Sequence, residues 1–288
     1  MSAHNITNIA VIGSGQMGGG IAQIAAVAGF STTVFDTAAP ALEKCKATHA
    51  KLLARAVEKG RMEQADMDAA QSRLTYVENL DALAGADIVI EAVVENAEVK
   101  KSIFANLDKR FTGNQILATN TSSISITEIA AATSSPARVI GMHFFYPVPV
   151  MKLVEVINGL ETDKAVAART IALAEAMGKV ALPANDRAGF VSNRVLMPMI
   201  NEAFYAWMEG VAEPEALDGI MKLGCNFPMG PLRLADFIGL DTCAHIMGVL
   251  AEGLNNDRYK PCPLLRQLVT AGRLGNKTGQ GVFDYSDR

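Results

Sequence analysis

The chain has 288 residues, of which half are hydrophobic and 6% aromatic, and its formal net charge is −4. This length allows a large core and two domains, and the small negative charge gives no reason to expect nucleic acid as a partner. No uncharged apolar stretch is long enough to cross a bilayer, and residues 1–5 lack the regions of a signal peptide. We therefore expect a cytoplasmic protein without a metal, whose cysteines show neither C-x-x-C pairing nor a ligand cluster and stay reduced: Cys45, Cys225, Cys243 and Cys262.

Residues 8–36 have the pattern of a dinucleotide site. Residues 8–12 (Asn-Ile-Ala-Val-Ile) predict a buried strand, residues 13–18 give G-x-G-x-x-G, apolar residues then recur at helical spacing, and a second strand, residues 31–35, ends at Asp36. The first glycine permits a tight turn, the second lets the backbone approach a pyrophosphate, and the third lets the helix pack closely on the strand. The predicted cofactor-binding residues here are Gly13, Gly15, Gln16, Met17, Gly18 and Asp36.

Asp36 also predicts which dinucleotide binds. A carboxylate about twenty residues after the glycines accepts from the ribose hydroxyls, whereas a 2′-phosphate would be repelled, and no arginine follows at once. We therefore expect NAD as the cofactor. The alternative is a glycine-rich turn in some other α/β protein.

A basic segment follows, which a minimal nucleotide fold does not need. Between residues 44 and 61 there are six basic residues and one acid, Glu58. Four of the basic residues, Lys44, Lys51, Arg55 and Lys59, have the spacing of a single helix face. One interpretation is that this helix face is simply solvated. The other is that it belongs to a helical arm (residues 37–75) whose Lys51, Arg55 and Lys59 attract phosphates such as those of coenzyme A.

Further strands and helices alternate up to residue 187. Strands are predicted at residues 87–91, 116–119, 139–142 and 179–183, with helices near 98–111 and 125–132. Such alternation is typical of a parallel sheet covered on both faces. We therefore expect an α/β fold whose first domain, residues 1–187, is a Rossmann-type doubly wound sheet with the helical arm inserted.

Residues 188–288 are expected to form an all-α domain. Their helical pattern is interrupted at Pro214, at residues 228–231, at Gly239 and at Pro261. Its Met-rich apolar surfaces are typical of a core or of a dimer interface: Met197, Met199, Met221 and Met247. We assign this domain to dimerisation and substrate binding.

His143 and Glu155 are the candidate catalytic residues. His143 follows the apolar run 139–142, and Glu155 interrupts the apolar run 153–157, where a carboxylate withdrawn from water needs a partner. Two prolines, Pro147 and Pro149, predict a turn that brings the two runs side by side. A carboxylate holding an imidazole makes a general base; the plainer alternative is a core histidine in a structural ion pair.

These residues resemble a known family, the short-form L-3-hydroxyacyl-CoA dehydrogenases, and within it the bacterial 3-hydroxybutyryl-CoA dehydrogenases. The resemblance covers nearly the whole chain. It rests on the segments Gly13–Ala22, Glu91–Asn96 with Lys100, Asn120–Ser123, Met142–Phe145, Pro147–Met151, Leu153–Val156, Gly189–Arg194, Pro228–Pro231 and Lys277–Gly279.

The resemblance implies roles for further residues. It implies that His143 is the base and Glu155 its partner, and that Ser122 and Asn193 bind the reacting oxygens of the substrate. It also implies cofactor contacts from Glu95, Lys100, Asn120 and Lys277. One departure is Tyr146, which stands where the family usually has Asn, so that a cofactor contact is either lost or replaced there. Apart from the resemblance, Ser122 is equally consistent with a helix N-cap, and Asn193 with an ordinary polar helix residue. Glu91 is interpreted as a buried sheet carboxylate and is left out of the site.

The chemistry that these residues fit is the reversible oxidation of a 3-hydroxyacyl thioester by NAD, in fatty acid or butanoate metabolism. It requires a base that titrates near neutrality and a nicotinamide on the far side of the carbon. One rival acts on another acid, such as 3-hydroxyadipyl-CoA or a free sugar acid like gulonate. Another is a catalytically silent NAD-binding relative resembling a lens crystallin. Free acids would not need the basic arm, and the intact set of Ser122, His143, Glu155 and Asn193 argues against the silent relative.

Overall fold

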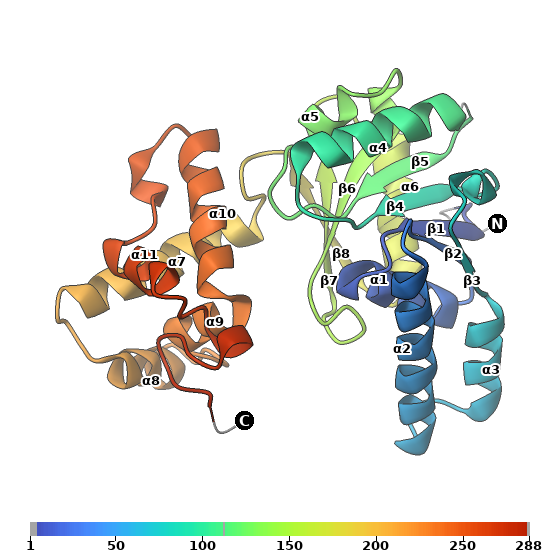
Figure 1. Ribbon diagram of the computed structural model, residues 1–288. Helices are drawn as coiled ribbons and strands as arrows, with labels where there is room; N and C mark the ends of the chain where they lie inside the picture. Colours follow the sequence, from blue (N-terminus) through green and yellow to red (C-terminus); the bar gives the residue numbers. More distant parts are fainter. Residues whose placement is uncertain (1–4, 112, 287–288) are drawn as a thin grey trace. The chain divides into compact units, whose positions relative to one another are not determined.

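The computed structural model describes residues 5–111 and 113–286 (Figure 1). It separates into two compact units, of which the first ends at Asp186 and the second begins at Arg187. Residues 1–4, which belong to the segment expected to lack a signal peptide, lie outside the described residues. Within the described part of the chain, no single helix is long and apolar enough to cross a membrane, although the bent pair formed by residues 231–238 and 240–253 passes that test jointly.

One eight-stranded sheet organises the first unit. Its strand order is β3-β2-β1-β4-β5-β6-β7-β8, and every neighbouring pair is parallel except β6 and β7. The expected parallel sheet is therefore confirmed except at this one antiparallel pair. The link between β6 and β7 is too short for the crossover of a dozen or more residues that a parallel pair needs, so β7 turns back. The strands are β1 (Asn8–Ile12), β2 (Ser31–Phe35), β3 (Leu74–Val77), β4 (Ile88–Glu91), β5 (Ile116–Thr119), β6 (Val139–Phe144), β7 (Leu153–Asn158) and β8 (Val180–Asn185).

Helices cover both faces of this sheet. The helices of this unit are α1 (Gln16–Val27), α2 (Ala39–Glu58), α3 (Gln64–Ser72), α4 (Ala97–Arg110), α5 (Ile126–Ala130) and α6 (Lys164–Ala176), with short 3₁₀ turns at Leu80–Leu83 and Pro136–Arg138. Of these, α2 and α3 pack on each other and on α1 and extend away from the sheet (Figure 1). The expected arm corresponds to α2 and α3, but residues 74 and 75 at its end belong to β3, in register with β2. The prediction missed this edge strand because four residues are too few to show a clear period.

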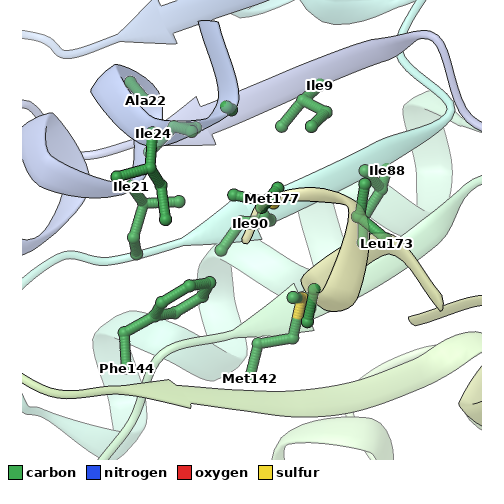
Figure 2. Packing of buried hydrophobic residues seen from close by; sticks show 14 of the residues in the cluster. Ile9, Ile21, Ala22, Ile24, Ile88, Ile90, Met142, Phe144, Leu173 and Met177 are labelled. Carbon is green, nitrogen blue, oxygen red and sulfur yellow. The ribbon is translucent and has the colours of Figure 1, made fainter. Parts of the chain in front are cut away.

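The two faces are distinguished by the alternation of side chains along each strand. On one face, β1, β4 and β6 pack against α1 and the end of α6 in a single apolar cluster, which includes Ile9, Ile21, Ile24, Ile88, Ile90, Met142, Phe144, Leu173 and Met177 (Figure 2). On the other face, a Cβ at Gly141 of β6 would lie 2.8 Å from Ile126 Cδ1 of α5. Because His143 has the same parity as Gly141, it lies on the side of the sheet opposite the apolar cluster.

The second unit is helical. Its elements are α7 (Ser192–Met208), α8 (Pro214–Gly224), α9 (Pro231–Ile238), α10 (Leu240–Gly253) and α11 (Pro263–Thr270), with 3₁₀ turns at Asp257–Tyr259 and Asn276–Thr278. Prolines begin α8, α9 and α11, where the missing N–H costs nothing. Met197 and Met247 are core residues of this unit, whereas Met199 and Met221 are half-buried.

The turn between β1 and α1 depends on glycines for two different reasons. A Cβ at Gly18 would lie 1.8 Å from the carbonyl oxygen of Gly13, so the helix can approach the strand only without a side chain there. A Cβ at Gly15 would meet nothing within 4 Å, and its φ of −67° suits any residue. Gly18 is thus required by packing, whereas Gly15 leaves open space next to the turn.

We expect Gly18→Ala to lower the free energy of unfolding by about 3 kcal/mol or more, because overpacking against rigid backbone costs at least the usual 1–3 kcal/mol. Gly15→Ala should change it by less than about 0.5 kcal/mol, as for a surface substitution. Calorimetric unfolding of the two variants without added ligand checks this expectation. Equal melting temperatures for both would contradict the packing argument.

Candidate active site

The glycine turn has the form of an anion-binding helix start. Gly13 has a φ of +98°, which favours glycine. Helix α1 begins at Gln16, and its N-cap residue, Gly15, offers no side-chain hydrogen bond to the first-turn N–H groups. These donors, beside the open space at Gly15, suit a pyrophosphate. Gly15 and Gln16 are exposed, Met17 is half-buried, and Gly13 and Gly18 are buried in the turn.

Asp36 joins the end of β2 to this turn. Its Oδ2 accepts hydrogen bonds from the backbone N–H of Ser14 at 2.8 Å and from the Ser14 hydroxyl at 2.7 Å. Burial raises the pKa of Asp36, but the hydrogen bonds from Ser14 and from the backbone of Thr37 and Ala38 outweigh it and lower the pKa below its ordinary value. The group is therefore an ionised acceptor beside the glycine turn, as a ribose hydroxyl requires.

His143 and Glu155 are direct cross-strand neighbours. They are partners in the antiparallel register of β6 and β7, and His143 Nδ1 lies 2.7 Å from Glu155 Oε2. Both side chains are over nine-tenths buried. An ionised Glu155 can only accept, which would place the hydrogen of this bond on Nδ1. The Phe145 ring packs on the imidazole, with the centroids 4.6 Å apart.

Ser122 lies in a loop that is held by a single carboxylate oxygen. Glu95 Oε1 accepts from the backbone N–H groups of Ser122 (2.9 Å) and Ser123 (3.0 Å). It also accepts from three hydroxyls, those of Thr121 (2.6 Å), Ser122 (3.2 Å) and Ser123 (3.0 Å). Burial raises the pKa of Glu95, but the Lys100 charge and these hydrogen bonds lower it overall. The loop is therefore organised around an anion.

The same loop is connected to the strand that carries His143. The side-chain oxygen of Asn120 accepts from the backbone N–H of Phe144 at 2.9 Å, directly after His143. Tyr146, at the departure from the family pattern, is 52% exposed, and the bond from Tyr146 to Pro147 is cis. The contact between Asn120 and Phe144 therefore connects the loop after β5 to the end of β6.

Lys100 is buried and ion-paired. Only 1% of its side chain is exposed, and Nζ lies 2.7 Å from Glu91 Oε1 and 3.5 Å from Glu95 Oε2. Glu91, which the sequence reading left out of the site, is the nearer partner and is itself fully buried. The sequence feature that could have identified Glu91 is Lys100, which lies nine positions later on α4.

Two predicted residues belong to the second unit. Asn193, in the first turn of α7, is 8% exposed. Lys277 is about half exposed, and its ammonium forms an ion pair with Asp241 at 2.5 Å. The basic residues of the arm, Lys51, Arg55 and Lys59, are all exposed on or just after α2.

The chain is similar to known proteins over nearly its whole length. Residues 8–187 match the family model of the 3-hydroxyacyl-CoA dehydrogenase NAD-binding domain, and residues 189–285 match the model of the C-terminal domain. The chain is 55% identical to the probable 3-hydroxybutyryl-CoA dehydrogenase of Bacillus subtilis (98% of this chain, 99% of the relative). It is 44% identical to the 3-hydroxyadipyl-CoA dehydrogenase of Escherichia coli (98% of this chain, 59% of the relative).

Among solved structures, the crystal structure of (S)-3-hydroxybutyryl-CoA dehydrogenase from Ralstonia eutropha superposes with a TM-score of 0.96 at 47% identity, covering 98% of this chain and all of the other. The fold is therefore the predicted Rossmann-type sheet followed by a helical domain, and the cofactor is NAD. The chain belongs to the family of NAD-dependent 3-hydroxyacyl-CoA dehydrogenases.

Proposed function

We propose that this enzyme oxidises short-chain L-3-hydroxyacyl-CoA thioesters, 3-hydroxybutyryl-CoA above all, to 3-oxoacyl-CoA such as acetoacetyl-CoA, reversibly. The observation that carries the proposal is the 2.7 Å hydrogen bond between His143 and Glu155 near the carboxyl end of β6. The glycine turn after β1 and the Ser122 loop after β5 stand at the same edge, where open α/β sheets bind ligands. The names of the relatives support the choice of substrate.

His143 is the acid and base in this proposal. Glu155 fixes the tautomer with the hydrogen on Nδ1, and Nε2 removes the proton of the substrate's 3-hydroxyl. The carboxylate stabilises the imidazolium that results, and the same group returns the proton in the reverse direction. When NAD is bound at the glycine turn and Asp36, it supplies the acceptor for the hydride that leaves C3. Glu95, Lys100, Asn120 and Lys277 remain proposed cofactor contacts.

Ser122 and Asn193 bind the reacting oxygens. The bond from the Ser122 hydroxyl to Glu95, at 3.2 Å, is long for a hydroxyl donor. A substrate oxygen can therefore compete for that hydrogen at small cost. Asn193 supplies an amide donor from the first turn of α7. Both side chains would stabilise the charge that develops on oxygen as the proton leaves.

Replacing the base tests the mechanism. His143→Gln should leave the NAD dissociation constant near its normal value and lower kcat by roughly 10²- to 10⁴-fold, the usual contribution of a positioned general base. Stopped-flow turnover together with fluorescence titration of the cofactor measures both quantities. Unchanged turnover would remove His143 from the mechanism.

The substrate class has two rivals. One is a different acid: 3-hydroxyadipyl-CoA, which the name of the E. coli relative suggests, or a free sugar acid such as gulonate. The other is a silent NAD-binding protein. We expect the highest kcat/KM with the C4 thioester in a panel of 3-hydroxyacyl-CoAs from C4 to C16, and no measurable rate with the free acids. Oxidation of gulonate, preference for the C6 dicarboxylic thioester, or NAD binding without any turnover would each select one rival instead.

The basic arm is the proposed contact for the phosphates of coenzyme A. Lys51, Arg55 and Lys59 are exposed, and none forms an ion pair with another described residue. Their charges are thus available to an anionic ligand. The phosphates of NAD bind instead at the glycine turn, so the two ligands should respond differently to changes in the arm.

Changing Lys51, Arg55 and Lys59 together to Gln should raise KM for the CoA thioester by about 10-fold at low salt, since each exposed contact contributes under about 1 kcal/mol. KM for NADH should not change. The difference should shrink above about 0.1 M salt, where the Debye length is near 10 Å. Lys109→Gln with Lys164→Gln, which removes two charges from exposed helix positions outside the arm, is the control. If the triple variant has the wild-type KM at low salt, the arm does not bind coenzyme A and is only a solvated helix face.

A homodimer through the helical unit is the proposed assembly, because closed two-fold dimers are the commonest oligomers. Large apolar side chains remain exposed on α7 and α8, notably Val195 (68%), Ile220 (62%) and Leu223 (90%). Ile220→Glu with Leu223→Glu should therefore halve the mass that light scattering gives at micromolar concentration. A wild-type mass equal to that of one chain would contradict the dimer.

A further inference from the structure

We propose that Glu91 is a positioning residue for the reaction: through Lys100 and Glu95 it fixes the loop that presents Ser122, and through its own backbone segment it braces the glycine turn. The inference rests on the proposed role of Ser122 and adds a residue that neither the sequence reading nor the family resemblance assigned to the site. The contacts of Glu91 in the described chain carry it.

Glu91 is a fully buried carboxylate with its hydrogen bonds directed to three different segments. Oε1 accepts from Lys100 Nζ and from the backbone N–H of Val93, both at 2.7 Å. Oε2 accepts from the hydroxyl of Thr119 at 2.7 Å, and Thr119 is its register partner on β5. A buried carboxylate persists as an anion only with such partners. Glu91 therefore ties together the ends of β4 and β5 and the helix α4.

On the cofactor side, Glu91 shapes the backbone that lies against the glycine turn. The bond to the N–H of Val93 closes a tight bend over residues 91–93. A Cβ at Gly13 would lie 2.6 Å from Ala92 O and 3.2 Å from Val93 N, so this bend is in direct contact with the first glycine of the turn. A shift of the bend would therefore move the turn.

On the substrate side, Glu91 acts through two charges. Lys100 Nζ lies 2.7 Å from Glu91 but 3.5 Å from Glu95, so Glu91 is the stronger partner and holds the ammonium away from close contact with Glu95. The other oxygen of Glu95 is then left to the five donors of the Thr121–Ser123 segment. Thr119 adds a second connection, because its hydroxyl accepts from the N–H of Thr121 at 3.2 Å.

We expect the removal of the Glu91 charge to change the positions of Lys100 and Glu95. Among the described residues, the buried ammonium of Lys100 would retain Glu95 as its ion-pair partner and would move toward it, since a buried charge without close compensation is costly. Glu95 would then turn from the Ser122 loop toward Lys100. The hydroxyl of Ser122 would lose its alignment, and small errors in such positions cost up to about 10²-fold in rate.

A purely structural ion pair would also lower stability, so the test measures coupling to Ser122. Glu91→Gln keeps the shape of the side chain and removes its charge. We expect it to lower kcat on 3-hydroxybutyryl-CoA about 10- to 100-fold in the wild-type background and less than about 3-fold in a Ser122→Ala background, because the second variant has no hydroxyl to misalign. Equal factors in both backgrounds would overturn the inference.

The Asp108–Arg138 pair provides the matched control. It is another buried ion pair of the first unit, at 2.7 Å with side chains about one-tenth exposed. Asp108→Asn should lower the melting temperature and leave kcat of the folded protein unchanged in both backgrounds. If it lowers kcat as Glu91→Gln does, the effect of Glu91 is loss of stability and the inference fails.

Two further variants keep the outcomes separate. If Glu91→Gln does not fold, Thr119→Val keeps the Glu91 charge and removes the donor to Oε2 together with the acceptor of the Thr121 N–H. It should show a smaller loss of kcat with the same dependence on Ser122; a loss of the same size in both backgrounds overturns the inference. The single variant Ser122→Ala tests the proposed function itself. Full activity in Ser122→Ala overturns the role of Ser122 and the inference that rests on it, whereas low activity combined with a wild-type rate for Glu91→Gln overturns the inference alone.

Discussion

The arrangement of the site depends on one constraint, the shared carboxyl edge of β1, β4, β5 and β6. These four strands run parallel and are adjacent in the sheet, so the segments that follow them must meet at one edge. The glycine turn follows β1, Glu91 ends β4, the Ser122 loop follows β5, and His143 lies one residue before the end of β6. Hydrogen bonds across this edge, such as those from Phe144 N to Asn120 and from Thr119 to Glu91, then fix the segments to one another.

The antiparallel strand β7 completes this edge. A residue that must orient the imidazole has to come from a strand that passes His143 at hydrogen-bonding distance, and the reversal after β6 brings Glu155 directly opposite it. Removed from water, an ionised carboxylate and an imidazole interact more strongly than they would on the surface, which is also why each requires the other. The same physics governs the Glu91–Lys100–Glu95 cluster, in which two carboxylates share one ammonium.

Local sequence patterns were sufficient where one residue type has few alternatives. The glycine turn and the strand ending at Asp36 were predictable from a short motif. The proximity of His143 to Glu155 followed from two apolar runs separated by prolines, and the helical second unit followed from helical spacing interrupted at prolines. The role of Glu91 was not, since its partner Lys100 lies on the next helix and its other contacts come from β5. Strand β3 and the reversal of β7 depend on sheet pairing, which a short apolar run does not reveal. The proposed roles of Lys277 at the cofactor and Asn193 at the substrate came from the family resemblance alone.

The central claim is that Glu155 holds His143 with its hydrogen on Nδ1, so that Nε2 is the proton acceptor. The most direct measurement is a ¹⁵N correlation spectrum of the histidine side chains at neutral pH, assigned with His143→Gln. We expect His143 to show a protonated Nδ1 and an unprotonated Nε2, and Glu155→Gln to disturb this tautomer. A protonated Nε2 with an unprotonated Nδ1 in the wild-type enzyme would show that Glu155 does not hold the imidazole in this tautomer.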